Sequence, residues 1–302
     1  MRFPPVSNRS VLVTGCSSGI GEAAARLLAE RGWKVIPTAR RRDDIERLRR
    51  LGFEPVELDL ASSESVRQAA AQVMELTRAS VGGIVNNAGY GQPGAVEDLD
   101  RDMLRRQFEV NLFGLVEFTN CFIPVFRRQG YGRIVNISSL VGRISLPFMG
   151  AYSATKFALE AISDAWRVEL QAAGIAVSII EPGPIATRFG DNALRHLWPL
   201  LEKAESPFHS FYREYARQRE SRVRGNLFRL PPEAVARRII HALESTRPKT
   251  RYPVTIPAVL AGWLRRLLPD RVLDRLVIRH WRRELALRGA AQSTSGGRRR
   301  SA

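Results

Sequence analysis

The segment Thr14-Gly15-Cys16-Ser17-Ser18-Gly19-Ile20-Gly21 decides the fold, because it lies between Val11-Leu12-Val13 and an Ala/Leu-rich run that ends at Leu28. The short β-branched run predicts a buried parallel strand, and the Ala/Leu-rich run predicts a helix. Three glycines allow a tight turn between them, and the start of the helix offers free N–H groups to a pyrophosphate. The spacing is not the usual Gly-x-Gly-x-x-Gly, so a dinucleotide site depends on the strand–turn–helix context. A plain glycine-rich turn is the alternative.

The second predicted strand, residues 33–38, ends in Ala39-Arg40-Arg41-Arg42. A site for NAD needs an acidic side chain there to hold the ribose 2′-hydroxyl. A neutral Ala39 followed by Arg40 instead suits a 2′-phosphate, through charge-assisted contacts. The pattern predicts a preference for NADP(H) over NAD(H) that depends on Arg40. The alternative is a solvated basic turn.

Tyr152 and Lys156 form the only Tyr-x-x-x-Lys pair in the chain. Four residues make about one helical turn, so the phenol and the ammonium lie on the same helix face. A nearby cation favours the phenolate, and the spacing therefore predicts a lowered pKa for Tyr152. Such a tyrosine can exchange a proton with a substrate oxygen. Because the pair alone is a weak signal, this interpretation depends on the motifs around it.

Three further motifs are each a predicted strand that ends in a polar or Pro-Gly turn: Ile84-Val85-Asn86-Asn87-Ala88-Gly89, Ile134-Val135-Asn136-Ile137-Ser138-Ser139 and Val177-Ser178-Ile179-Ile180-Glu181-Pro182-Gly183-Pro184. With them the chain resembles the classical short-chain dehydrogenases/reductases over residues 9–190. Three stretches are most similar to the branch of 17β-hydroxysteroid and retinol dehydrogenases: Leu146-Pro147-Phe148, the run from Tyr152 to Glu160 and the run from Glu181 to Phe189.

The resemblance implies a catalytic set of Asn111, Ser139, Tyr152 and Lys156. In the family, the asparagine holds a relay water with its backbone carbonyl, and the serine hydrogen-bonds the substrate oxygen. The tyrosine is the acid in reduction and the base in oxidation, and the lysine also holds the nicotinamide ribose. Ser138 points the other way on an extended strand. For Asn111, a structural interruption of a helix is the alternative.

The resemblance also implies a cofactor site that spans four predicted strand ends. The glycine segment would cradle the phosphates, an acidic residue after the third strand (55–58) would meet the adenine, and Asn87 would line the adenine ribose. Three residues of the Pro-Gly loop would face the nicotinamide carboxamide. The full expected set is Gly15, Ser17, Ser18, Gly19, Ile20, Gly21, Arg40, Asp59, Leu60, Asn87, Tyr152, Lys156, Pro182, Ile185 and Thr187.

Alternating strand and helix patterns predict an α/β fold, a Rossmann-type doubly wound parallel sheet in a single domain with a C-terminal helical extension. The expected division is a leader at 1–8, a catalytic domain at 9–250 with a substrate lid at about 188–230, a basic amphipathic extension at 251–288 and a disordered tail at 289–302. Aromatic residues in the lid suit a flat or long apolar ligand. Ordinary helix packing is the alternative.

Cys16 and Cys121 lie in unrelated segments without metal spacing, which predicts reduced structural thiols. No metal site is expected, since the four histidines lack a ligand pattern. Reduced thiols and NADPH chemistry predict a cytoplasmic location. No signal peptide is expected, and no stretch is expected to reach the roughly 18 apolar residues of a spanning helix.

The net charge of +17 is concentrated near the C-terminus, where residues 262–302 hold 11 arginines against three acids. Two helices are predicted there, over 258–268 and 270–287, split at Pro269. In the second, Leu273, Leu276, Val277 and Trp281 form an apolar stripe between arginines, which suggests peripheral contact with a membrane surface. Docking on the catalytic domain or on a second subunit is the alternative. The resemblance implies a homodimer or homotetramer.

These patterns predict an NADP(H)-dependent oxidoreductase that interconverts an apolar ketone or aldehyde and its alcohol, with a steroid-, retinoid- or fatty-carbonyl-like substrate. One alternative is a 3-oxoacyl reductase whose basic face receives an acidic carrier protein. Another is a non-catalytic NADP(H)-sensing regulator, since a fold alone does not prove catalysis. Basic charge attracts nucleic acid without specificity, but no reading motif accompanies it, so no specific nucleic-acid partner is expected.

Overall fold

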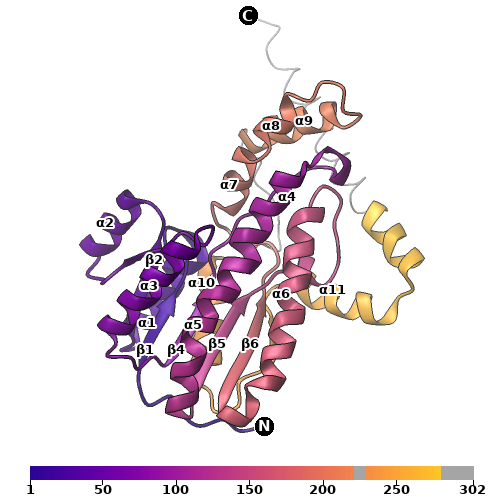
Figure 1. Cartoon of the computed structure of the whole chain (residues 1–302). Helices are drawn as coiled ribbons and strands as arrows, with labels where there is room; N and C mark the ends of the chain where they lie inside the picture. Colours follow the sequence, from indigo (N-terminus) through magenta and orange to yellow (C-terminus); the bar gives the residue numbers. More distant parts are fainter. Residues whose placement is uncertain (221–228, 280–302) are drawn as a thin grey trace, which may run out of the picture.

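The computed structural model describes residues 1–220 and 229–279. Its centre is a seven-stranded sheet of order β3-β2-β1-β4-β5-β6-β7, in which all pairs are parallel. The strands are β1 (Ser10–Val13), β2 (Lys34–Ala39), β3 (Val56–Glu57), β4 (Gly83–Asn86), β5 (Gly132–Ile137), β6 (Ile175–Glu181) and β7 (Arg251–Pro253). The predicted Rossmann-type fold is confirmed (Figure 1). The second and third strands differ from the predicted ranges by one residue at each end.

Helices cover both faces of the sheet (Figure 1). They are α1 (Gly19–Glu30), α2 (Arg42–Arg50), α3 (Ser63–Leu76), α4 (Arg101–Phe108), α5 (Gly114–Gln129), α6 (Gly150–Glu169), α7 (Phe189–Arg195), α8 (Trp198–Leu201), α9 (His209–Glu220), α10 (Pro232–Glu244) and α11 (Ile256–Leu267). Short turns are η1 (Val96–Asp98), η2 (Glu109–Phe113), η3 (Leu140–Gly142) and η4 (Gln171–Ala173).

Two apolar layers enclose the sheet, because successive side chains of a strand point to opposite faces. In β1, Val11 and Val13 pack with α1, α2 and α10, whereas Leu12 packs with α3, α5 and α6. Every residue of β1 is buried, as expected for a parallel strand that helices cover on both faces. Because all the strands are parallel, their carboxyl ends lie at the same edge of the sheet. The loops that follow them carry the predicted site.

A third apolar cluster lies outside the sheet layers and holds the predicted lid. Leu197, Leu200 and Tyr212, from the α7–α9 segment, are buried against Leu99 and Met103. The lid aromatics therefore pack against the body of the protein, which is the alternative role that the sequence analysis gave for them. Residues 221–228 of the predicted lid lie outside the described residues.

One helix is longer and more apolar than the sequence analysis expected. It runs for 29 residues from Arg101 to Gln129, through α4, the π-helical η2 and α5, and it could cross a membrane by length and composition alone. The expectation that no stretch reaches such a composition is wrong. Phe118, Phe122 and Phe126 on this helix are fully buried against the sheet, so its apolar residues serve the core.

The C-terminal helices break at Pro269, between α11 and a second helix that begins at Asp270 and continues to residue 279, the last described in this region. The rest of the predicted second helix and the predicted tail, residues 280–302, lie outside the described residues. The predicted leader lies on the body, since Phe3 N donates to Thr246 O (2.8 Å) and Arg133 donates to Pro4 O (2.7 Å).

Candidate active site

The glycine segment after β1 folds into a turn that only glycine permits. Gly15 and Gly19 have φ of +73° and +63°. A Cβ at Gly21 would lie 2.3 Å from the carbonyl oxygen of Gly15 and 2.6 Å from Nδ2 of Asn87, so no other residue fits there. The backbone of the first turn of α1 therefore approaches the loop as closely as a dinucleotide site requires.

Asn87 braces this turn. Its Nδ2 donates to Thr14 O (2.9 Å) and to Gly15 O (3.1 Å). The sequence analysis expected Asn87 to line the adenine ribose, but its amide N–H groups are committed to the loop. It therefore acts first on the shape of the phosphate-binding turn.

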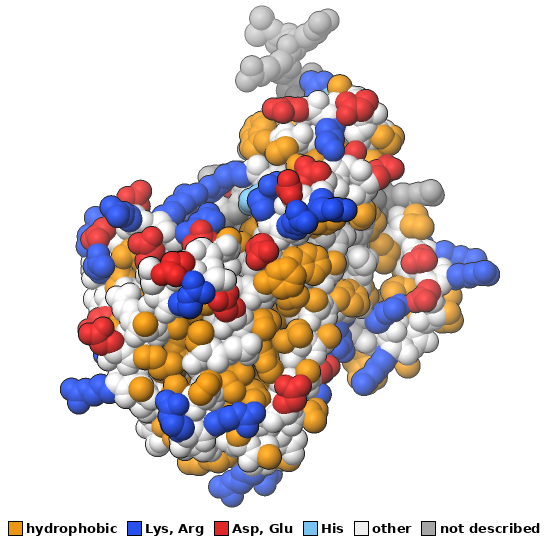
Figure 2. Space-filling model, in the orientation of Figure 1, with side chains coloured by type: hydrophobic (Ala, Val, Ile, Leu, Met, Phe, Trp, Pro, Cys, Tyr) orange, Lys and Arg blue, Asp and Glu red, His pale blue; other side chains and the backbone are white. Residues whose placement is uncertain are grey.

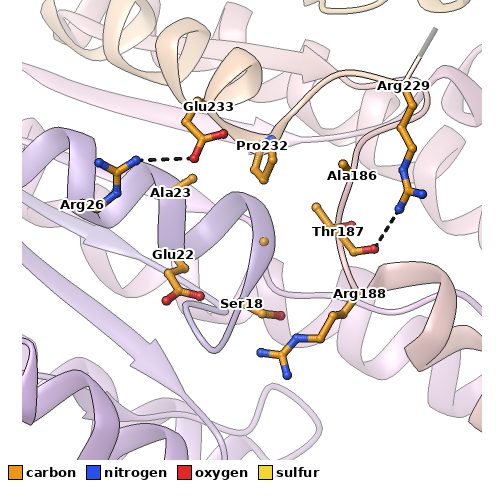
Figure 3. Close-up of a pocket in the computed structure, with 11 residues that line it drawn as sticks. Ser18, Glu22, Ala23, Arg26, Ala186, Thr187, Arg188, Arg229, Pro232 and Glu233 are labelled. Carbon is orange, nitrogen blue, oxygen red and sulfur yellow. Dashed lines mark hydrogen bonds and ion pairs between the residues drawn. The ribbon is translucent and has the colours of Figure 1, made fainter. Parts of the chain in front are cut away.

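A pocket of about 590 Å³ opens beside the start of α1 (Figure 3). Ser18, the residue before the helix, makes no side-chain capping hydrogen bond. Unpaired N–H groups at a helix start bind anions. The pocket is lined by Ser18, Gly19, Glu22, Ala23, Arg26, Ala186, Thr187, Arg188, Arg229, Pro232 and Glu233.

The Pro-Gly loop after β6 lies against the glycine segment, although the two are about 170 residues apart in the sequence. A Cβ at Gly19 would lie 3.0 Å from the side chain of Thr187. Arg188 donates to Ser17 O (3.3 Å) and Arg229 donates to Thr187 O (3.4 Å). These guanidinium groups add positive charge beside a turn suited to a pyrophosphate, so the residues fit a dinucleotide.

Arg40 follows β2 and its side chain is exposed. Within residues 1–220 and 229–279, Arg40 has no ion pair. Asp59 follows β3, the strand that pairs with β2, and its Oδ1 accepts from Ala61 N (3.0 Å). Leu60 is buried beside it. The guanidinium of Arg40, which was predicted to bind a 2′-phosphate, therefore has no competing ion pair among the described residues. It lies at the same edge of the sheet as Asp59.

The predicted catalytic side chains meet between η3 and α6. The hydroxyl of Ser139 acts on Tyr152 by lowering its pKa, and Ser139 Oγ accepts from Val141 N (3.3 Å). Lys156 Nζ lies 5.7 Å from the centre of the Tyr152 ring and donates to Ile137 O (2.7 Å). Ser138 lies apart from this group, with its Oγ buried near Gly142.

Burial reverses the expected pKa of Tyr152. The helix α6 does place Tyr152 and Lys156 on one face, but both side chains are buried. Burial raises the pKa of Tyr152 well above its usual value, and the nearby Ser139 hydroxyl offsets this only in part. Burial also lowers the pKa of Lys156 to about 8, against the attraction of Glu160. The predicted lowering of the Tyr152 pKa is therefore wrong, because desolvation outweighs the nearby ammonium.

Asn111 lies in the π-helical turn η2 and is fully buried. Its side chain accepts from Tyr90 N (3.0 Å) and donates to Tyr90 O (2.8 Å) and to Thr155 Oγ1 (3.2 Å). It thus joins the loop after β4 to the catalytic helix α6. A π-helical turn often marks a functional position. The side-chain contacts give Asn111 a structural role, and the water-holding role of its carbonyl remains a prediction.

Sequence analysis missed a buried charge cluster behind Lys156. Arg251, the first residue of β7, lies 3.1 Å from Glu160, 2.6 Å from Asp164 and 3.4 Å from Glu181. Burial and the neighbouring Glu160 raise the pKa of Glu181 to about 7. Glu160 stands one helical turn after Lys156, and this spacing could have identified it. Arg251 had no local signal.

The comparisons with known proteins agree with this geometry. A family model described as short chain dehydrogenase matches residues 9–197. The uncharacterized oxidoreductase YbbO of Escherichia coli is 43% identical over 272 residues, which cover 90% of this chain and 95% of that protein. Human retinol dehydrogenase 16 is 36% identical over 280 residues, covering 86% and 83%. A short-chain dehydrogenase structure from Streptomyces avermitilis has a TM-score of 0.71 and 32% identity, covering 94% of this chain and 98% of that one.

Proposed function

The chain belongs to the short-chain dehydrogenase family, and we propose that it is an NADP(H)-dependent oxidoreductase that interconverts an apolar ketone or aldehyde and its alcohol. The observation that carries the proposal is the buried pair on α6, in which Lys156 Nζ lies 5.7 Å from the centre of the Tyr152 ring, with the Ser139 hydroxyl near enough to lower the pKa of Tyr152. A non-catalytic sensor would need the glycine turn but no proton donor beside it.

The roles of the chain's own residues follow from this arrangement. A bound nicotinamide cofactor supplies or takes the hydride. In reduction, the Tyr152 hydroxyl donates its proton to the substrate carbonyl oxygen, and Ser139 holds that oxygen by a hydrogen bond. Burial raises the pKa of Tyr152, so the phenol stays protonated at neutral pH and is ready to donate. Lys156 would hold the nicotinamide ribose, and its charge would favour recovery of the proton.

The cofactor preference is proposed from Arg40. No acidic side chain follows β2 directly, and the first acids, Asp43 and Asp44, lie in the first turn of α2. An NAD site would need a carboxylate at this strand end, where the chain has a neutral Ala39 followed by Arg40. We propose that Arg40 pairs with the 2′-phosphate, and that Asp59 and Leu60 flank the adenine.

The substrate class is proposed from the surroundings of Tyr152. The ring of Phe189 lies 5.3 Å from that of Tyr152, and Phe148 stacks on Phe211 of α9 at 3.9 Å. Aromatic walls of this kind favour a flat or long apolar carbonyl compound. The similarity to a retinol dehydrogenase supports the same class.

Three finer proposals complete the assignment. Phe113 and Phe157, on η2 and α6, are exposed apolar side chains that support a homodimer or homotetramer. Cys16 and Cys121 are both free thiols, which supports a reducing, cytoplasmic location. Peripheral contact of the C-terminal helices with a membrane is the third proposal.

The first experiment measures NADPH oxidation across steroid, retinoid, fatty-aldehyde and 3-oxoacyl carrier-protein substrates, with NADH in parallel. We expect turnover on an apolar carbonyl class with NADPH preferred. Turnover on the 3-oxoacyl substrate alone would favour the carrier-protein alternative. NADPH binding without turnover on any substrate would favour the sensor.

Arg40→Asp tests the cofactor assignment. Loss of a charge-assisted contact to the 2′-phosphate should weaken NADPH binding by about tenfold to hundredfold, while NADH binding is unchanged or improved. Arg42→Asp, in α2, is the matched control. An unchanged ratio of NADPH to NADH affinity in Arg40→Asp would refute the assignment.

A further inference from the structure

An apolar stripe on α11 faces solvent. Five side chains follow the spacing i, i+3, i+4, i+7, i+11, which places them on one face of a helix. Trp263 is 59% exposed and Leu267 is 71% exposed, whereas Ala258 and Ala261, on the opposite face, are buried. The helix thus packs on the body through small residues and turns its large ones outward. The α11 stripe consists of Ile256, Val259, Leu260, Trp263 and Leu267.

The body of the protein holds α11 firmly in this orientation. Thr255 caps the helix by accepting from Ala258 N (3.3 Å), and its buried side chain fills the space beside Gly183. A Cβ at Gly262 would lie 3.9 Å from Arg143, which directly follows η3. Because η3 begins one residue after Ser139, the α11 stripe is tied to the same loops that hold the catalytic serine.

Basic residues lie at the end of α11 and on the helix that follows it. Residues 256–279 contain five arginines against two aspartates, and Arg265 pairs with Asp270. Basic side chains gather on the projecting helices that end the described chain (Figures 1 and 2). A narrow apolar face with arginines beside it is typical of a helix that lies in a lipid interface. Across the described ranges, four arginines here have no ion pair: Arg266, Arg271, Arg275 and Arg279.

A second copy of the chain fits this surface poorly. A two-fold contact joins the same patch of two copies, so the arginines without ion pairs from both copies would gather in or around one contact. The cores of protein interfaces are also depleted in charged residues. An anionic lipid surface complements both features at once, because its phosphates meet the arginines and its acyl chains receive the stripe.

We infer that α11 docks on an anionic lipid surface, with Leu260 and Trp263 inserted at the acyl boundary. The inference rests on the proposed function for its biological purpose: if the substrate is apolar, a bilayer concentrates it near the catalytic loops. The sequence analysis expected the helix at 270–287 to contact the membrane, whereas the inference assigns this contact to α11. Leu273, in the predicted stripe of the next helix, is buried, so that helix uses part of its apolar face for packing.

The test is flotation of the full chain with vesicles of phosphatidylcholine alone or with added phosphatidylglycerol. We expect binding to the anionic vesicles that weakens with salt. Leu260→Asp should reduce the partition coefficient by about tenfold or more, the effect of removing one buried apolar side chain and adding a charge. Leu51→Asp, an exposed leucine after α2, is the matched control and should bind as the parent does.

Three results would overturn the inference. The first is that the parent does not bind anionic vesicles, and the second is that Leu260→Asp binds them as well as the parent does. The third is that Leu260→Asp changes the oligomeric state, measured as the molar mass in solution, without losing vesicle binding. The last result would assign α11 to a contact between copies. Turnover of a water-soluble carbonyl compound by Leu260→Asp should match the parent, so a failure of docking remains distinct from a failure of the proposed oxidoreductase function.

Discussion

Two buried tyrosines, Tyr152 in the catalytic helix α6 and Tyr212 in the lid helix α9, share a direction of pKa change but not an environment. Burial raises the pKa of both. The hydroxyl of Ser139, which follows β5, lowers the pKa of Tyr152, whereas Tyr212 accepts from Ala95 N (3.0 Å) and donates to the carboxylate of Asp98. The partners, rather than the burial, therefore distinguish them.

The difference shows what each hydroxyl can do. The proton of Tyr212 is held by a carboxylate that Ser206 also contacts, at 2.7 Å, and Lys203 donates to Asp98 O (2.7 Å). This group fastens the lid to the loop after β4. Among the described residues no carboxylate acts on the pKa of Tyr152, so a substrate oxygen can compete for its proton. One tyrosine is suited to hold structure and the other to transfer a proton.

Tyr152→Phe should have the largest effect. Removal of a general acid should lower kcat by about a hundredfold to ten-thousandfold. The free energy of unfolding should change by no more than about 1 kcal/mol, the value of one neutral hydrogen bond, because the variant removes a single hydroxyl. Steady-state kinetics and NADPH binding by fluorescence check this. Turnover equal to that of the parent would remove Tyr152 from the mechanism.

Tyr212→Phe should show the reverse pattern. The buried N–H of Ala95 and the carboxylate of Asp98 each lose a partner, which should lower the free energy of unfolding by about 1–3 kcal/mol. Turnover at saturating substrate should stay near that of the parent. Denaturant unfolding measures the first quantity and initial rates the second. If both tyrosine variants lose turnover equally, the distinction between the two sites fails.

The smallest expected effect is a pH dependence of activity that comes from Lys156. It distinguishes the two tyrosine sites, because Lys156 lies beside Tyr152. The pKa of Lys156 is lowered to about 8, so above that pH the ammonium loses its proton and kcat/KM for reduction should fall by about tenfold per pH unit. The unfolded chain holds this proton to higher pH, so the linked term raises stability as pH rises from about 8 towards the ordinary lysine value. A pH profile of Tyr212→Phe should keep this fall in activity. A profile of the parent that stays flat above pH 8 would contradict the assignment.

Sequence patterns were sufficient where the physics is local. The continuous apolar run of β1 predicts a strand buried on both faces, the Ala/Leu run predicts the helix α1, and Gly15 and Gly21 determine a turn that no other residue can adopt. The spacing of Tyr152 and Lys156 determines that they share a helix face. Those features are properties of a few consecutive residues, so they could be predicted.

Contacts between distant segments could not be predicted in this way. The approach of Thr187 to Gly19, the bonds of Tyr212 to Asp98 and the pairing of Arg251 with Glu160 join residues about 90 or more positions apart. No spacing in the sequence marks these pairs, because packing of the sheet and its helices brings them together.

The sequence by itself determined a parallel α/β fold, a glycine turn for a dinucleotide and a tyrosine–lysine pair on one helix face. Only the tertiary structure decided that Tyr152 is buried enough for its pKa to rise, that Asn87 braces the glycine turn and that α11 turns its large apolar residues outward. The physical reason is that desolvation and burial depend on every segment packed around a residue, whereas helix and strand periodicity depends only on its neighbours in the chain.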